Sequence, residues 1–203
     1  MDMADDAPAR ARLARWYIDQ ALPLWGDAGF DRGVGLYHEQ LTFGGDAIVV
    51  PALRLMVQCR QIAVFARMTH EGLWASAEAA TVAFDTIRRR YRSPDGAPGW
   101  VFSVSRDGVV ADATRDLYAH AFVLYACAWM HRLTGDAAYL RDADDTLAAV
   151  DRVFGVGEGY LAARPGNPDE RLQNPHMHLF EGLLALAETS GRQEHMDRCH
   201  ALV

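Results

Sequence analysis

Three residues that could take part in acid–base or oxygen-binding chemistry recur at nearly equal spacing along the chain. They are Arg60, Tyr118 and His178, separated by 58 and 60 residues, and each lies in an apolar stretch with helical periodicity. A histidine exchanges protons near neutral pH, an arginine donates N–H groups to oxygen-rich ligands, and a tyrosine can line a pocket. The spacing predicts a structural repeat. If its helices form a ring, the three side chains come together at one end of that ring.

The segment around His178 is the most informative part of the chain. Asn174 followed by Pro175 predicts a helix start, with the asparagine as the N-cap and the proline in the first turn. On such a helix His178 and Glu181 share a face, so the carboxylate can orient the imidazole or raise its pKa. His176 lies about 200° around the helix from His178, so we expect no metal site made of these two histidines.

Each candidate also has a purely structural interpretation. Asn174 could serve only as a helix cap, and His178 could be a hydrogen-bonded core histidine. Arg60 stands among apolar neighbours, where an arginine needs either an ion-pair partner or a bound ligand. Tyr118 could be a core residue whose hydroxyl is satisfied locally.

Helical periodicity and glycine-rich interruptions alternate along the chain and predict an all-α fold. Helices are expected over 8–25, 52–69, 72–91, 115–134, 136–153 and 175–190, with a further helix after Gly191. The loops expected between them are 26–50, which could hold a short hairpin, 93–113, which could hold a strand at 100–104, and 155–173. Helix starts near 52, 115 and 175 predict a repeated helical hairpin that stacks as a superhelix or closes into a ring.

Composition and charge narrow the function classes. The net charge is −7, which disfavours nucleic acid or an anionic membrane as a partner, and all 20 positively charged side chains are arginine. Without lysine, a Schiff base or a phosphate-loop lysine is excluded. The acidic N-terminus does not resemble a signal peptide and no apolar stretch reaches membrane-spanning length, so we expect a soluble cytoplasmic protein.

The cysteines are few and widely spaced. Cys59, Cys127 and Cys199 fit no zinc or redox spacing. Cys59 and Cys127 fall in apolar helical patterns, which predicts buried free thiols in a reducing compartment.

These motifs together resemble the N-acylglucosamine 2-epimerase family of sugar epimerases and aldose–ketose isomerases. The resemblance rests on Arg54-x5-Arg60, Asp116-Leu117-Tyr118-Ala119-His120-Ala121-Phe122-Val123-Leu124, Gln173-Asn174-Pro175-His176-Met177-His178-Leu179-x-Glu181 and the early Leu22-Pro23-Leu24-Trp25. It implies an (α/α)6 barrel and proton transfer at C2 of an aldose, an N-acyl hexosamine or a reducing-end glucose, through a cis-enediolate, without metal or cofactor.

The resemblance also implies roles for individual residues. Arg60 would contact the sugar oxygens near C1 and C2, and Tyr118 would line the pocket. Asn174 and His178 would bind the substrate at the reacting carbons, with His178 as the catalytic candidate and Glu181 as a further substrate-binding residue.

The length corresponds to about three of the six helical hairpins of such a barrel. We expect a single domain over 1–203, equivalent to the N-terminal half of the family and truncated at the C-terminus. The family's principal acid–base histidines belong to the second half, for which no motif is present. A half-ring exposes apolar helix faces, which predicts a homo-oligomer or a missing C-terminal half as partner.

Two other functions stay open from the sequence. A glycoside hydrolase or lyase on a related toroid would use carboxylates about 5–10 Å apart, for which Asp112, Asp116 and Glu181 are the plausible donors. A catalytically inactive half-barrel that only binds sugar is the non-enzymatic alternative.

Overall fold

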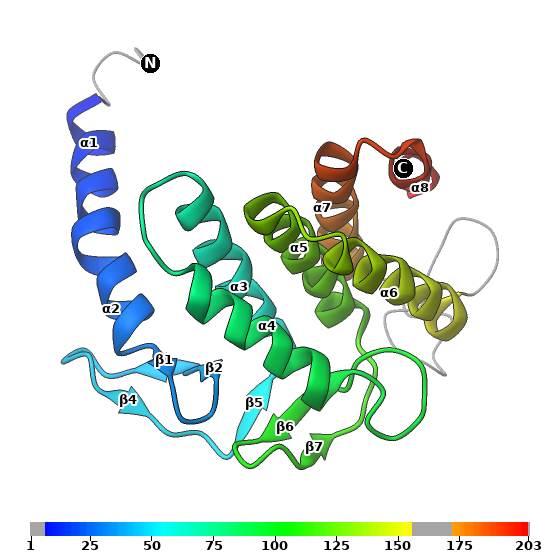
Figure 1. Ribbon diagram of the computed structural model, residues 1–203, viewed down its shortest axis with the longest axis horizontal. Coiled ribbons are helices and arrows are strands. Elements are labelled where there is room, and N and C mark those ends of the chain that lie inside the picture. The colour runs from blue at the N-terminus through cyan, green and yellow to red at the C-terminus, as the bar shows by residue number, and fades with distance from the viewer. Residues whose placement is uncertain (1–6, 156–171, 203) are drawn as a thin grey trace.

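Consecutive helices pack as pairs, and the pairs stand side by side across the molecule (Figure 1). The computed structural model describes residues 7–155 and 172–202, so most of the predicted loop 155–173 lies outside the described residues. Within the described part no helix is both long and apolar enough to cross a bilayer. The dominance of helices confirms the all-α prediction.

The helical elements have the following bounds. They are α1 (Ala7–Trp16), a π-helical turn (Tyr17–Ala21), α2 (Leu22–Asp27), α3 (Leu55–His70), α4 (Ala77–Tyr91), α5 (Leu117–Thr134), α6 (Ala138–Phe154), α7 (Gln173–Ser190) and α8 (Gln193–Ala201). The starts of α3, α5 and α7 reproduce the predicted repeat of about 60 residues.

Short antiparallel strands accompany the helices. They are β1 (Phe30–Asp31), β2 (Leu36–Tyr37), β3 (Gln40–Leu41), β4 (Ala47–Ile48), β5 (Ala52–Arg54), β6 (Ser103–Ser105) and β7 (Val110–Asp112). Strand β1 pairs with β2, β3 pairs with β4, and β5, β6 and β7 form one sheet in that order. This sheet lies at the lower end of the helix pairs in Figure 1.

The predicted helix over 8–25 is present but contains a π-helical turn. Pro23 has no backbone N–H, and its ring crowds the carbonyl of Asp19 four residues earlier. Asp19 lies in the wider turn Tyr17–Ala21, which relieves this conflict so that the helical run continues to Asp27.

The predicted start of the second helix at residue 52 is wrong. Residues 52–54 form β5, with Leu53 opposite Val104, and α3 begins only at Leu55. The Leu55 N–H donates to the Phe102 carbonyl at 2.9 Å. The predicted strand at 100–104 is displaced to Ser103–Ser105, because this pairing fixes its register.

The helices α3, α5 and α7 form an inner row, in which α5 packs against both neighbours. Its side chains are largely buried, and it ends at Gly135, whose φ of +74° provides the left-handed C-cap. The outer helices α4, α6 and α8 each pack against the inner helix that precedes them. Helix α5 is therefore the centre of the described structure.

A buried carboxylate joins two outer helices. Asp142 of α6 is 5% exposed and accepts hydrogen bonds from Arg88 at 2.6 and 3.0 Å and from Arg92 at 2.9 Å. Such charge-assisted bonds satisfy a carboxylate that would otherwise be costly to bury. They link the helix pair α3–α4 to the pair α5–α6.

All three cysteines are buried and free, which confirms the prediction for Cys59 and Cys127. Burial raises the pKa of each thiol above its ordinary value. The thiols therefore stay protonated and act as small apolar side chains.

His120 is a structural residue of α5. Its Nδ1 lies 2.7 Å from the Asp116 carbonyl and its Nε2 accepts the Trp100 N–H at 3.0 Å. The residue is fully buried, and a Cβ at Gly99 would lie 2.6 Å from Nε2. This arrangement requires the neutral imidazole, and burial lowers the pKa of His120 to about 4.

Helix α7 reaches α5 closely because residue 182 is a glycine. A Cβ at Gly182 would lie 2.9 Å from the Ala121 carbonyl oxygen and 3.3 Å from the Leu124 Cβ. The backbones of the two inner helices thus approach where no side chain separates them.

We expect Gly182→Ala to destabilise the chain by about 1–3 kcal/mol, although alanine is the better helix former. Chemical denaturation measures the effect, and Gln173→Ala, at an exposed position of the same helix, is the control. Equal or greater stability of the Gly182→Ala variant would show that the close approach does not constrain the packing.

Lowering the pH should destabilise the chain through His120. The folded pKa of about 4 lies below the ordinary value of 6.5, so the stability is complete above pH 6.5 and is lost as the pH falls toward 4. The loss should reach about 3 kcal/mol at pH 4. Urea denaturation between pH 8 and pH 4 should show a smaller decline in His120→Gln, and identical declines would contradict the assignment.

Candidate functional site

The structure brings Arg60, Tyr118 and His178 together on the inner helices. Phe122, one turn after Tyr118 on α5, connects them: the Arg60 guanidinium carbon lies 5.2 Å from its ring centroid, and the His178 ring lies 4.7 Å away. Tyr118 packs edge-on against His178, with 5.0 Å between centroids. We call Arg60, Tyr118, Phe122, His178 and Glu181 the inner-helix cluster. The predicted convergence is present, and Phe122 is a further member that was not predicted.

A carboxylate fixes the tautomer of His178. Its Nδ1 lies 2.8 Å from Oε2 of Glu181, one turn later on α7. A carboxylate only accepts hydrogen bonds, so Nδ1 carries the proton and donates to it. The His178 side chain keeps 20% of its surface exposed, and its Nε2 is the nitrogen available for proton exchange.

Arg60 has no ion-pair partner among the described residues. Its guanidinium lies over the Phe122 ring, and its Nη1 donates to the Met56 sulfur at 4.0 Å. The residue is exposed, and no carboxylate of the described chain lies within ion-pair distance. Its N–H groups are therefore available to an oxygen-rich ligand.

The prediction that Asn174 caps its helix is wrong. Helix α7 begins at Gln173, two residues before the predicted start at Pro175, and its N-cap is Leu172 without a side-chain hydrogen bond. Pro175 still fits, because the N–H groups of a helix's first turn have no intrahelical partner. Asn174 is exposed one turn before His178, which leaves it available to a ligand.

A groove continues from His178 along α5 and α7. Its volume is about 750 Å³. It is lined by Arg67, Glu71, Tyr125, Trp129, Arg132, Met177, His178, Phe180, Glu181, Leu184, Ala185, Glu188 and Thr189. In this groove Trp129 contacts two arginines. The guanidinium carbons of Arg67 and Arg132 lie 5.2 and 4.8 Å from the centroid of the Trp129 ring.

This groove was not predicted, although the amino-acid sequence contains a signal for it. Tyr118, Phe122, Tyr125 and Trp129 follow one another at steps of four, three and four residues, which places them on one face of α5. Such a stripe is usual for a core-facing helix surface. Here the stripe leads from the inner-helix cluster into the groove.

The carboxylates considered for a hydrolase have other roles. Asp116 is the N-cap of α5 and accepts the Ala119 N–H at 2.8 Å. Asp112 accepts the Thr114 N–H at 2.8 Å. Glu181 binds His178, so all three are already engaged in hydrogen bonds.

Comparisons with known proteins agree with this architecture. The chain is 34% identical to a mannose-6-phosphate isomerase of Rhizobium meliloti over 88% of its own length and 46% of that protein. A solved D-mannose isomerase superposes with a TM-score of 0.81 at 20% identity, covering 100% of this chain and 51% of that one. A solved cellobiose 2-epimerase from Spirochaeta thermophila superposes with a TM-score of 0.84 at 22% identity, covering 98% of this chain and 54% of that one.

These matches establish how much of the barrel is present. The structural likeness shows an α/α-barrel fold. The chain spans about half the length of the relatives that it matches. A more distant likeness, with a TM-score of 0.66 at 16% identity, extends to an unsaturated glucuronyl hydrolase from Bacillus, over 96% of this chain and 55% of that one. The sequence profile of N-acylglucosamine 2-epimerase matches residues 35–203. The chain therefore belongs to the N-acylglucosamine 2-epimerase family.

Proposed function

We propose that this chain forms the sugar-binding half of a barrel that isomerises or epimerises an aldose by moving a proton at C2. The observation that carries the proposal is the inner-helix cluster, in which an oriented imidazole and an arginine without a carboxylate partner among the described residues both contact the ring of Phe122. Family membership and relatives named for mannose isomerisation and cellobiose epimerisation support it.

His178 is the acid–base group of the proposal. With Nδ1 bound to Glu181, its Nε2 can take a proton from the carbon beside the carbonyl of the open-chain sugar. The electron pair of the broken C–H bond forms the C=C bond of a cis-enediolate, and the carbonyl oxygen becomes negatively charged. Return of the proton to the opposite face of C2 gives the epimer, and its delivery to C1 gives the ketose.

Arg60 is proposed to stabilise the enediolate oxygen. Its guanidinium lies over the Phe122 ring, with 5.2 Å between the guanidinium carbon and the ring centroid, and this contact restricts the side chain before the sugar binds. Oriented N–H donors at the site of developing charge are among the strongest contributions to catalysis. Tyr118 and Asn174 would complete the contacts to sugar hydroxyl groups, together with the second oxygen of Glu181.

The remaining half of the barrel would come from a C-terminal segment or from a second subunit. Return of a proton to the opposite face of C2 needs a second acid–base group facing His178, which this partner would supply. Of the carboxylates that glycoside hydrolysis would need, Asp116 caps α5 and Glu181 orients His178.

Replacement of His178 should abolish proton exchange while the fold persists. In deuterium oxide, the protein should incorporate deuterium at C2 of D-mannose, D-glucose, N-acetylglucosamine or cellobiose, as followed by proton NMR. We expect His178→Asn to slow this exchange by about 10²–10⁴-fold at an unchanged melting temperature. His176→Asn, two residues away on another face of α7, is the control.

The outcomes of this experiment separate the alternatives. Exchange that is equally fast in His178→Asn would remove this residue from the mechanism. Saturable sugar binding without exchange would identify a sugar-binding half-barrel, and release of a reducing sugar from a disaccharide would identify a hydrolase.

Replacement of Arg60 should weaken sugar binding itself. We expect Arg60→Met to lose about 1.5–3 kcal/mol of binding free energy, because a charged hydrogen-bond donor is removed without loss of the aliphatic stem. Isothermal titration with the sugar that exchanges fastest measures the change. Arg141→Met, at an exposed position of α6, is the control, and equal affinities in the two variants would contradict direct contact of Arg60 with the bound sugar.

A further inference from the structure

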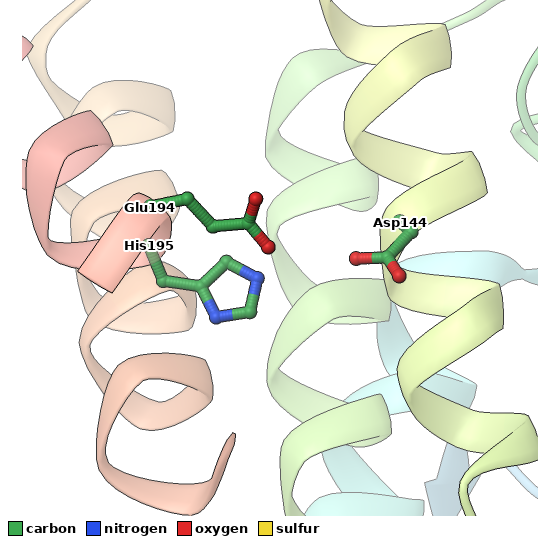
Figure 2. Close-up of side chains that lie close together, drawn as sticks. All are labelled: Asp144, Glu194 and His195. Carbon is green, nitrogen blue, oxygen red and sulfur yellow. The ribbon is translucent and has the colours of Figure 1, made fainter. Parts of the chain in front are cut away.

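A second group of polar side chains meets between two outer helices. Asp144 projects from α6, and Glu194 and His195 project from the first turn of α8, as Figure 2 shows. One potential ligand atom from each lies within 4.8 Å of the other two. We call these three residues the outer-helix cluster. The inner-helix cluster lies on other elements, namely α3, α5 and α7.

The hydrogen bonds of Ser190 determine which nitrogen of His195 carries the proton. The Ser190 hydroxyl donates to the Leu186 carbonyl at 2.7 Å, and its oxygen lies 3.0 Å from Nδ1 of His195. The single hydroxyl hydrogen is used in the first bond, so Nδ1–H must be the donor in the second. Nε2 is therefore the unprotonated nitrogen with a free lone pair.

This lone pair is buried without a partner. His195 is 1% exposed, and its Nε2 has no hydrogen-bond partner among the described residues. Figure 2 shows this edge of the ring turned toward the Glu194 and Asp144 carboxylates. Carboxylates are also acceptors, so neither can satisfy a lone pair.

Arg192 neutralises part of the charge in the cluster. Its Nη1 donates to both oxygens of Asp144, at 2.9 and 3.1 Å, and its Nη2 contacts Glu194. Two carboxylates and one guanidinium leave a net charge of −1 beside the neutral imidazole. No donor among residues 7–155 and 172–202 reaches the Nε2 lone pair, and a metal ion is a positively charged centre that accepts such a lone pair.

We propose that Asp144, Glu194 and His195 bind one divalent transition-metal ion of the zinc class, which joins α6 to α8. One imidazole nitrogen and two carboxylate oxygens suit Zn²⁺ better than Ca²⁺ or Mg²⁺, which prefer oxygen ligands alone. The bond from Nδ1–H to Ser190 is the outer interaction that usually orients a metal-binding histidine. In the zinc-bound state each of the three ligand atoms would lie about 2.0–2.2 Å from the ion.

The ion and Arg192 compete for the same carboxylate oxygens. Ion binding therefore displaces the guanidinium from Asp144, and removal of the guanidinium should favour the ion.

Titration of the full chain with zinc chloride in a calorimeter tests the proposal. We expect one ion per chain, at least tenfold weaker binding in Asp144→Asn and His195→Gln, and at least threefold tighter binding in Arg192→Gln. Asp151→Asn is the matched control, because it removes the ion pair with Arg198 that also joins α6 to α8. Asp144 is partly exposed, so its variant tests the site even where replacement of buried His195 disturbs folding.

Substitution with Co²⁺ identifies the ligands independently. The expected visible spectrum has the d–d bands of nitrogen and oxygen ligation and no sulfur charge-transfer band. The absence of saturable Zn²⁺ binding in the wild-type chain would overturn the proposal. Binding of equal affinity in Asp144→Asn and wild type, or a thiolate spectrum, would do the same, since the ion would then be bound elsewhere.

Discussion

The distance between helices α5 and α7 determines the geometry of the inner-helix cluster. At Gly182 the α7 backbone comes so close to the Ala121 carbonyl that a methyl group would lie 2.9 Å from the oxygen. His178 lies one turn before this contact, and its ring consequently reaches Phe122 and Tyr118. Arg60 joins from the other side of α5. One missing side chain thus supports contacts among three helices.

The inner and outer helices carry different kinds of side-chain interaction. The inner helices present aromatic and titratable groups toward the groove, whereas arginine–aspartate pairs connect the outer helices. Asp142 accepts three N–H bonds from two arginines, and Arg198 binds Asp151 through both terminal nitrogens. A guanidinium can bind a carboxylate in this forked manner and an ammonium cannot, which suits a chain without lysine.

The sequence predicted features that depend on local periodicity and missed those that depend on distant partners. The register of Arg60, Tyr118 and His178 was predictable, because a repeated helical hairpin places equivalent residues at equivalent heights. Strand β5 was missed because its partner, β6, lies about 50 residues later. The prediction that Asn174 caps the helix was wrong. A proline fits any position of the first turn, because the N–H groups there have no intrahelical partner, and Pro175 therefore did not define the first residue of α7. The site roles themselves remain predictions.

The reactivity of the buried cysteines reports which part of the structure opens. Cys59 and Cys127 lie on the inner helices α3 and α5, whereas Cys199 lies on the outer helix α8. A thiol reagent can modify a buried cysteine only when the surrounding structure opens. The modification rate of Cys199 therefore reports local release of the last helix, and the rates of the other two report opening of the inner row. Separation of α8 from the rest of the fold and loss of the core become distinguishable in one unaltered chain.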